Sequence, residues 1–449
     1  MKDYDLITGI IPSEENTIFF VLKKSEHLFC FTTNEAHSLR NTNKSIELQT
    51  KDGFLIGKTH NNYQIAIYVG SKTFLVSNSK YLRTSTYVIS KSNVNETSLE
   101  KFDGIKFVGG TLNRLFYRNS MRSEYTENGL QVKAHDDRKN YDIKTKDFNI
   151  KLSIYSAISE KNSIENGNAI SNTDVQLVLK FEKKQSLYQL FYHYNRIRDI
   201  IAFMTFRYNV GFSDIKLFNY NEEFNFLEEM ASVYIESEFE LTKKRYFQNI
   251  CFEDLDTAIP ELFKIFYDSE DRKMSYSLGF YPKNDNEINY MTDSKIREIC
   301  SGIECELNFA EGIEVEENEL LNKLVRQVKN TVKKFRKDNP GLEDSVYSFV
   351  FGNIKFWTLP AAEKICALFH KYDEEMSILN QSEIVIDDDA IKEFVKYRND
   401  ITHGSHRVLD VKIAITAQCL GGLVYCCFLE RIGIKRTKVL EWCKNKILR

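Results

Sequence analysis

The chain has 449 residues, of which 42% are hydrophobic and 28% charged, and its formal net charge is -3. This length suffices for two or three domains with their own cores, and the composition excludes disordered and fibrous proteins. The charge is uneven: residues 391 to 449 carry 12 Lys and Arg against 5 Asp and Glu, a surplus of +7 that leaves -10 for the rest. A basic end suits a polyanionic partner, and a solvated basic surface explains it nearly as well.

Three features bear on location and cofactors. The N-terminus carries Asp3 and Asp5 and lacks a basic-then-apolar signal pattern, which predicts a cytoplasmic protein. The uncharged run from 413 to 429 contains Thr416 and Gln418 and is short for a membrane span, so we expect a buried core helix and no membrane contact. Nine cysteines without C-x-x-C spacing predict reduced thiols, no structural metal and no cofactor.

Residues 1 to about 155 have the pattern of a β-rich sandwich or barrel. Short runs rich in Ile, Val, Phe and Tyr alternate with Asn, Ser, Lys and Gly, as expected of strands joined by turns. The predicted strands are Thr17 to Leu22, His27 to Thr32, Gly53 to Ile56, Gln64 to Val69, Thr73 to Val76, Tyr87 to Ile89 and Phe148 to Tyr155. The polar run from 160 to 172 predicts a loop.

The hydrophobic period then changes from two to about 3.6. Alternation over 175 to 181 predicts one more strand, and the spacing of apolar residues predicts an amphipathic helix from Ser186 to about Phe206, ended by Gly211. The segment from Asp214 to Phe218 is predicted to form a further strand after the helix. A break in the pattern near residue 222 predicts a boundary there, with a β-rich domain over 1–222 and a helical domain over 223–449.

The second domain is predicted to be all-helical. Candidate helices are Leu227 to Ser237, Leu255 to Tyr267, Ser294 to Phe309, Glu317 to Lys337, Leu342 to Val350, Ala361 to Met376, Ala390 to about Thr402, and Leu409 to Arg431. The helix over 317–337 has an apolar stripe opposite a row of cations: Lys323, Arg326, Lys329, Lys333, Lys334 and Lys337. We interpret this row as a solvated face, with RNA contact as the alternative.

The densest chemistry lies in residues 397 to 404, Tyr-Arg-Asn-Asp-Ile-Thr-His-Gly. An amphipathic run precedes it, with acidic residues 387 to 389 placed to cap the helix and Gly404 to end it. Arg398 is a permanent cation that can bind an oxyanion, and the imidazole of His403 can move a proton. This combination suits phosphate chemistry. The alternative is an ordinary basic helix terminus.

This Arg-Asn-x-x-x-His-Gly stretch, in a helical half and before an apolar helix, resembles the HEPN superfamily, and within it the ApeA-like HEPN group of bacterial anti-phage proteins. The segment REICSGIECELNF (297 to 309) is similar to an earlier family helix that carries an acidic residue. The segment from 186 to 218 is similar to the end of the β-rich domain that accompanies these helices. The resemblance implies an α+β protein, in which a β-rich sandwich or barrel-like domain with a sensor role precedes an all-α HEPN bundle.

The resemblance also assigns roles to residues. It implies that Arg398 and His403 are catalytic, that Asn399 helps to position them, and that Glu304 is the acidic residue of the site, with Glu306 and Glu298 as competing candidates. The neighbouring positions expected to bind substrate are Lys396, Thr402, His406 and Arg407. No metal ligand is expected. Some HEPN toxins have a tyrosine two residues after the histidine as a modification target, and Ser405 stands there instead, which puts such control in doubt.

The expected function is a metal-independent HEPN-type RNA endonuclease, a toxin of an abortive-infection system. It would cleave RNA, with tRNA as one candidate, by attack of the 2′-OH, leaving 2′,3′-cyclic phosphate and 5′-OH ends. The family implies a homodimer with a composite cleft, and a phage-derived trigger is a further expected partner. Two alternatives stay open: a non-catalytic HEPN adaptor that binds nucleotide or RNA, and a structural two-domain protein.

Overall fold

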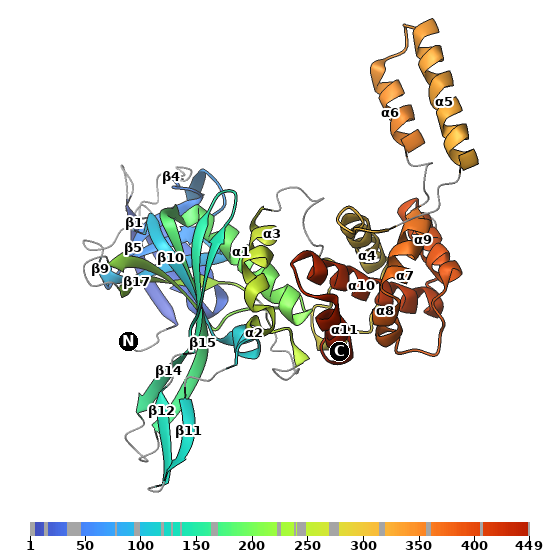
Figure 1. Cartoon of the computed structure of the whole chain (residues 1–449). Helices are drawn as coiled ribbons and strands as arrows, with labels where there is room; N and C mark the ends of the chain where they lie inside the picture. Colours follow the sequence, from blue (N-terminus) through green and yellow to red (C-terminus); the bar gives the residue numbers. More distant parts are fainter. Residues whose placement is uncertain are drawn as a thin grey trace. The chain divides into compact units, whose positions relative to one another are not determined.

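The computed structural model describes residues 5–12, 17–33, 46–76, 79–93, 99–117, 121–126, 129–134, 137–162, 169–221, 226–237, 239, 248–268, 278–313, 319–355, 361–404 and 407–447. The chain divides into two compact units. The first comprises Met1–Asp268 with Lys283–Asp285, and the second comprises Ser269–Pro282 with Asn286–Arg449. The first unit is rich in strands and the second is helical (Figure 1), so the predicted α+β class is confirmed.

One 13-stranded antiparallel sheet forms the framework of the first unit, with the strand order β13-β14-β15-β10-β16-β17-β9-β6-β5-β1-β2-β3-β8. These strands are β1 (Leu6–Pro12), β2 (Thr17–Lys23), β3 (Leu28–Thr33), β5 (Phe54–Thr59), β6 (Tyr63–Tyr68), β8 (Ser79–Arg83), β9 (Thr86–Asn93), β10 (Lys101–Val108), β13 (Lys139–Lys144), β14 (Asn149–Asn162), β15 (Ala169–Ser186), β16 (Asp214–Asn221) and β17 (Phe226–Ile235). Two separate ribbons pair β4 (Ile46–Gln49) with β7 (Thr73–Val76), and β11 (Met121–Thr126) with β12 (Gly129–Ala134). Single 3-10 turns lie at Lys24–Glu26, Gly110–Arg114, Asp256–Ala258 and Asp285–Glu287.

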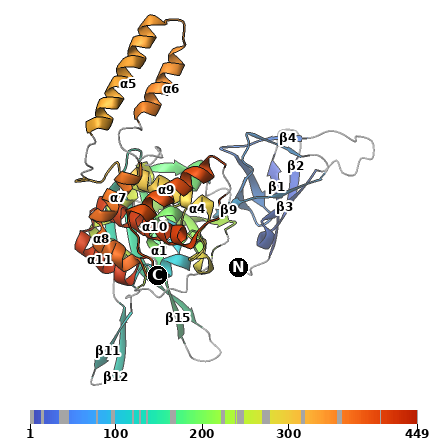
Figure 2. The same ribbon diagram turned by 90° about the vertical axis from the view of Figure 1, so that its right-hand side faces the viewer.

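The N-terminal strands, seen on the right of Figure 2, pack around a single hydrophobic core. In β2 the residues Ile18, Phe20 and Leu22 are buried, whereas Phe19 and Val21 are each 42% exposed. This alternation places one face of the strand against the core and the other in solvent. Side chains from β1, β3, β4, β5, β6, β7 and β9 complete the same core, which agrees with the predicted barrel-like arrangement.

Helix α1 (Leu187–Thr205) follows β15 directly, as the change of period predicted. A capping box starts it, because the Ser186 backbone N–H donates to the Gln189 side chain at 2.9 Å. The helix ends at Phe206, which adopts a left-handed φ of 54°, before the glycine at 211 that the sequence suggested. The buried side of α1 packs against α3 (Ile259–Asp268), which follows the short helix α2 (Phe252–Leu255).

Two sequence predictions for the first unit were wrong. The predicted helix from Leu227 to Ser237 is strand β17, which pairs with β16 on one side and β9 on the other. The sheet therefore continues past residue 222, and the first compact unit extends to Asp268. The predicted loop over 160–172 also contains the paired ends of β14 and β15, which run on as a ribbon (Figure 1).

The second unit is built around α10 (Val411–Arg431). It packs against α4 (Asp293–Glu306), α8 (Asp373–Leu379), α9 (Asp388–Thr402) and α11 (Arg436–Asn445), while α7 (Ala361–Lys371) packs on α8 and α9. By length and composition α10 is the one helix in the described parts of the chain that could cross a membrane, but 72% of its apolar window is buried. The predicted buried core helix is therefore confirmed. The helix predicted over 361–376 is broken at Tyr372 into α7 and α8.

Helices α5 (Glu319–Asp338) and α6 (Asp344–Lys355) lie between α4 and α7 in the sequence and form an antiparallel hairpin (Figures 1 and 2). Val325 of α5 and Tyr347 and Ile354 of α6 are buried, with exposed fractions of 3%, 4% and 2%. Arg336 joins the helices by an ion pair with Asp344 at 2.7 Å. The hairpin therefore has its own small core.

Candidate active site

The sequence motif lies at the C-terminal end of α9. Asp387 is the N-cap of this helix and accepts a hydrogen bond from the Ala390 backbone N–H at 2.8 Å, as the sequence predicted. At the other end His403 is the C-cap residue, and its backbone N–H donates to the Asn399 carbonyl at 3.0 Å. Gly404 follows with a φ of +82°, a left-handed conformation that favours glycine and ends the helix.

Arg398 is held in place by two acceptors on different elements. Its Nη2 donates to Oε1 of Glu304 on α4 at 3.1 Å, and its Nη1 donates to Oδ1 of Asn399 at 3.1 Å. The side chain of Arg398 is 26% exposed and that of Glu304 is 46% exposed. A guanidinium has five N–H donors, so these two bonds fix its orientation and leave donors for an oxyanion.

The three candidate glutamates of α4 have different surroundings. Glu304 contacts Arg398, as described above. Glu306 is 2% exposed and pairs with Arg431 of α10 at 2.9 Å, so it belongs to the core of the unit. Glu298 lies against Gly279, where an added Cβ would come within 2.7 Å of its carboxyl carbon. Of the three, Glu304 is therefore the one placed beside the motif.

His403 is exposed, and none of the described side chains hydrogen-bonds to its imidazole. Positions five apart on an α-helix differ in direction by about 140° around its axis. Arg398 points toward α4, so the histidine at the C-cap lies on a different side of α9. One copy of the chain therefore holds Arg398 against α4 and leaves the imidazole of His403 exposed at the end of α9.

The four expected substrate-binding residues are not alike. Lys396 is exposed and forms no ion pair with any residue that the structure describes. Thr402 is exposed, and its hydroxyl donates to the Arg398 carbonyl at 2.7 Å, which is a local helix bond. Arg407 pairs with Glu393 at 2.7 Å and Asp400 at 3.5 Å. Glu393 and Asp400 are two turns apart on α9, on the side of the helix away from Arg398. The fourth residue, His406, lies outside the described residues.

Sequence reasoning missed Arg297 of α4. Its Nη2 donates to the carbonyl of Ile401 at 2.8 Å, in the last turn of α9. Asp293 accepts a hydrogen bond from the Tyr397 hydroxyl at 2.9 Å, so α4 holds the end of α9 at two points. The signal in the sequence is the seven-residue spacing of Arg297 and Glu304, which places both on one face of a helix two turns apart.

Cys300 lies between these two residues on the same face of α4. It is buried, and its Sγ is 3.9 Å from Oε1 of Glu304. Burial raises the pKa of this thiol to about 11, so it stays protonated near neutral pH and is a poor nucleophile. All nine cysteines are free thiols, as predicted. The reactive groups at this surface are therefore the guanidinium, the imidazole and the carboxylate.

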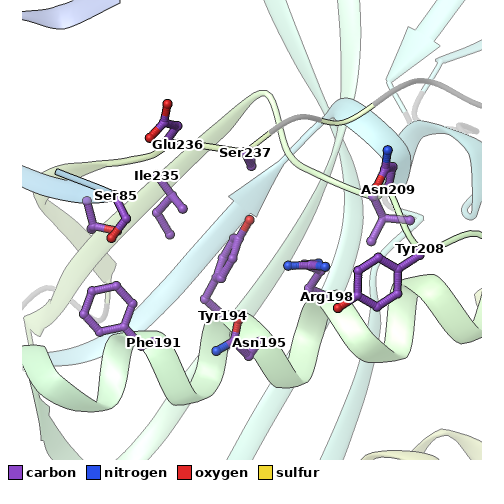
Figure 3. Close-up of a pocket in the computed structure, with 12 residues that line it drawn as sticks. Ser85, Phe191, Tyr194, Asn195, Arg198, Tyr208, Asn209, Ile235, Glu236 and Ser237 are labelled. Carbon is purple, nitrogen blue, oxygen red and sulfur yellow. The ribbon is translucent and has the colours of Figure 1, made fainter. Parts of the chain in front are cut away.

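A second candidate site is a cavity of about 290 Å³ in the first unit (Figure 3). It is lined by Phe191, Tyr194, Asn195 and Arg198 of α1, together with Ser85, Thr86, Tyr208, Asn209, Val210, Ile235, Glu236 and Ser237. The Arg198 guanidinium stacks on the Tyr208 ring at 4.7 Å. A cation on an aromatic ring beside amides, hydroxyls and the Glu236 carboxylate can hold a small polar ligand.

No protein-family model, curated protein or solved structure matches this chain. Among the residues that the structure describes, no three His, Cys, Asp or Glu side chains gather as metal ligands would. The functional assignment therefore depends on the geometry and chemistry of the side chains around α4 and α9.

Proposed function

We propose that this protein is a metal-independent endoribonuclease of the HEPN type. The observation that carries the proposal is that Arg398, oriented by Glu304 and Asn399, precedes an exposed His403 by five residues at the end of one helix. A fixed cation with free donors suits a phosphoryl group, and a solvent-accessible imidazole suits proton transfer. RNA is the substrate that needs only these two functions, because its 2′-OH supplies the nucleophile.

The reaction follows from these roles. The imidazole of one His403 takes the proton of the 2′-OH as the 2′-oxygen bonds to phosphorus. The bond between phosphorus and the 5′-oxygen breaks, and the leaving oxygen takes a proton from a protonated imidazole. Arg398 donates hydrogen bonds to the phosphoryl oxygens as negative charge builds on them. The products are a 2′,3′-cyclic phosphate and a 5′-OH.

A homodimer is part of the proposal, because helical spacing sets positions 398 and 403 about 140° apart around the axis of α9. In a two-fold assembly the arginine of one copy faces the histidine of the other, and both copies contribute to one cleft. We further propose that the protein acts in abortive anti-phage defence and that the first unit senses a phage-derived trigger. The polar cavity beside Arg198 is the feature of that unit that favours a sensor role.

The second candidate function is a non-catalytic module that binds nucleotide or RNA. The ion pair between Glu304 and Arg398 is compatible with it, since a paired arginine can hold a ligand without cleaving it. Thr402 and the exposed Lys396 can contact phosphate in either case. The two functions differ in whether the RNA chain is cut.

Purified protein and a defined RNA distinguish the two functions. We expect wild-type protein to cut the RNA in EDTA, and a single 2′-deoxy substitution at the cut site to stop the cut there. His403→Ala should still bind the RNA without cutting it, whereas His370→Ala, which removes another exposed histidine of the same unit, should cut like wild type. Binding without cleavage by wild type under every condition would establish the adaptor instead.

A further inference from the structure

Helix α5 carries a continuous basic face. Six cations occupy it, and 3.6 residues per turn place all of them within an arc of about 140°. They are Lys323, Arg326, Lys329, Lys333, Lys334 and Lys337. With a rise of about 1.5 Å per residue, the row from the first to the last is roughly 21 Å long.

Acidic side chains do not neutralise this face. The ion pair of the hairpin joins Asp344 to Arg336, which is not one of the six. None of the six forms an ion pair within 4 Å with any residue in the described parts of the chain, and all are exposed apart from half-buried Lys329. The helix has seven Lys and Arg against Glu319 and Asp338, a surplus of +5 in a chain whose net charge is -3.

The hairpin keeps this face turned outward. Val325, buried at 3%, marks the side of α5 that packs on α6, and Tyr347 and Ile354 are buried on the facing helix. The Tyr347 hydroxyl donates to the Asn339 carbonyl at 3.3 Å, and Arg336 lies over the same ring at 5.4 Å. The six cations are therefore presented on a helix whose orientation is fixed by its neighbour.

The position of the apolar residues on α5 helps to decide whether the basic face binds an anionic membrane or a nucleic acid. Leu320, Leu324 and Phe335 are exposed by 78%, 50% and 54%. Helical spacing places Leu320 about 110°, Leu324 about 150° and Phe335 about 170° from the centre of the basic arc. A bilayer that buried this apolar strip would leave most of the cations pointing away from its headgroups. A nucleic acid contacts the basic side alone, and phosphates on both walls of a groove match cations spread over a wide arc.

We propose that the basic face of α5 binds the phosphate backbone of the RNA on which the enzyme acts, without reading its sequence. This proposal rests on the proposed function in that it names where that substrate is held. The hairpin then supplies affinity, and the site on α9 supplies cleavage.

The test uses full-length protein and a 2′-O-methyl RNA stem-loop, which has no 2′-OH nucleophile and so reports binding without cleavage. The variant is Arg326→Gln/Lys329→Gln/Lys333→Gln, since glutamine preserves the helix. The control is Lys101→Gln/Lys139→Gln/Lys183→Gln, which removes three exposed cations from strands of the first unit and changes the net charge equally. Circular dichroism checks that both variants fold.

We expect the α5 variant to raise the Kd at least tenfold and the control to leave it within twofold. The slope of log Kd against log salt should fall by about two to three for three lost phosphate contacts. Unchanged Kd in the α5 variant, or an equal loss in the control, would overturn the proposal.

Two further outcomes distinguish this proposal from a membrane-binding site and from the endonuclease assignment. If phosphatidylserine vesicles bind wild type but not the α5 variant, and both bind RNA equally, the face is a membrane site and the proposal is wrong. If the α5 variant loses RNA binding and wild type never cuts a cleavable RNA, the RNA-binding face stands and the endonuclease assignment fails.

Discussion

The orientation of the Arg398 guanidinium depends on one carboxylate and one amide. Glu304 and Asn399 each accept a hydrogen bond from it at 3.1 Å. Under the proposed function both are positioning residues, because they would act on the substrate through the arginine. A small displacement of a group that stabilises a transition state costs rate rather than stability. The ion pair of Glu306 with Arg431 is buried, so its loss is expected to cost stability rather than rate.

This contrast gives a first prediction. Glu304→Gln should lower the rate of RNA cleavage about 10- to 100-fold, because Arg398 loses the anionic partner that orients it. The melting temperature should change little, because the pair is partly exposed. Glu306→Gln should instead lower the free energy of unfolding by about 3–5 kcal/mol, because the Arg431 cation stays buried without its counter-ion. Cleavage assays and thermal melts measure the two effects. Equal effects of both variants on rate and stability would contradict this division of roles.

His193 of α1 supports a prediction on pH. It is fully buried among aromatic rings, with Nδ1 3.3 Å from the Tyr267 hydroxyl, and burial lowers its pKa to about 3. An unfolded imidazole titrates near 6.5, so below that pH the unfolded state takes up a proton that the folded state excludes. The stability that this histidine contributes is therefore present above about pH 6.5 and is lost as the pH falls toward 3.

Wild type should lose about 2 kcal/mol between pH 6.5 and 5 through this residue, from about 1.4 kcal/mol per pH unit. His193→Phe keeps an aromatic ring and should remove that part of the loss, as measured by urea unfolding at the two pH values. His370→Phe, at an exposed position of α7, serves as the control. Identical pH dependence in wild type and His193→Phe would show that burial of this histidine has no such effect.

At the scale of elements, the helix that carries the site was predictable and its partner contacts were not. The Asp387 cap, the apolar stripe and the glycine after residue 403 are local signals, and all three act as expected in α9. Arg297 and Glu304 are about 100 residues from the motif, and a single sequence does not show which glutamate of a helix faces a distant arginine. The structure supplies that choice through the packing of α4 on α9.

Strand β17 shows why other elements were mispredicted. Its Glu228, Glu229 and Ala231 favour a helix, and its apolar residues also recur at helical spacing. Glu229 instead pairs with Lys91 of β9, Lys106 of β10 and Lys216 of β16. Burial alone would raise the pKa of Glu229, but these lysines lower it to about 2. Contacts between strands distant in sequence therefore override local propensity here.

A prediction at this scale concerns the bond from Arg297 to the last turn of α9. Arg297→Met should loosen that turn, speed amide hydrogen exchange at Ile401 and His403, and lower cleavage about tenfold. Global stability should change by less than about 0.5 kcal/mol, because the side chain lies at the surface. Ser301→Ala, on an exposed position of α4, is the control. Unchanged exchange at the two amides would mean that this bond does not hold the turn.

At the scale of the whole molecule, the proposed homodimer can be tested by complementation between two variants. A heterodimer of Arg398→Ala and His403→Ala subunits retains one intact arginine and one intact histidine, on different chains. We expect mixing and co-refolding of the two inactive variants to restore about a quarter of the wild-type cleavage rate. About half of the dimers are then heterodimers, and each has one intact arginine–histidine pair where the wild-type dimer has two. If the mixture stays as inactive as its components, both groups must act from the same chain.

The central claim is that a guanidinium and an imidazole at the end of α9 cut RNA by attack of its own 2′-OH. The most direct test is to map RNA ends from cells that produce the protein, with and without phage infection, at matched protein levels. We predict 2′,3′-cyclic phosphate ends at defined sites with wild type and His370→Ala, and their loss with His403→Ala. The same ends at the same abundance with His403→Ala would contradict the account.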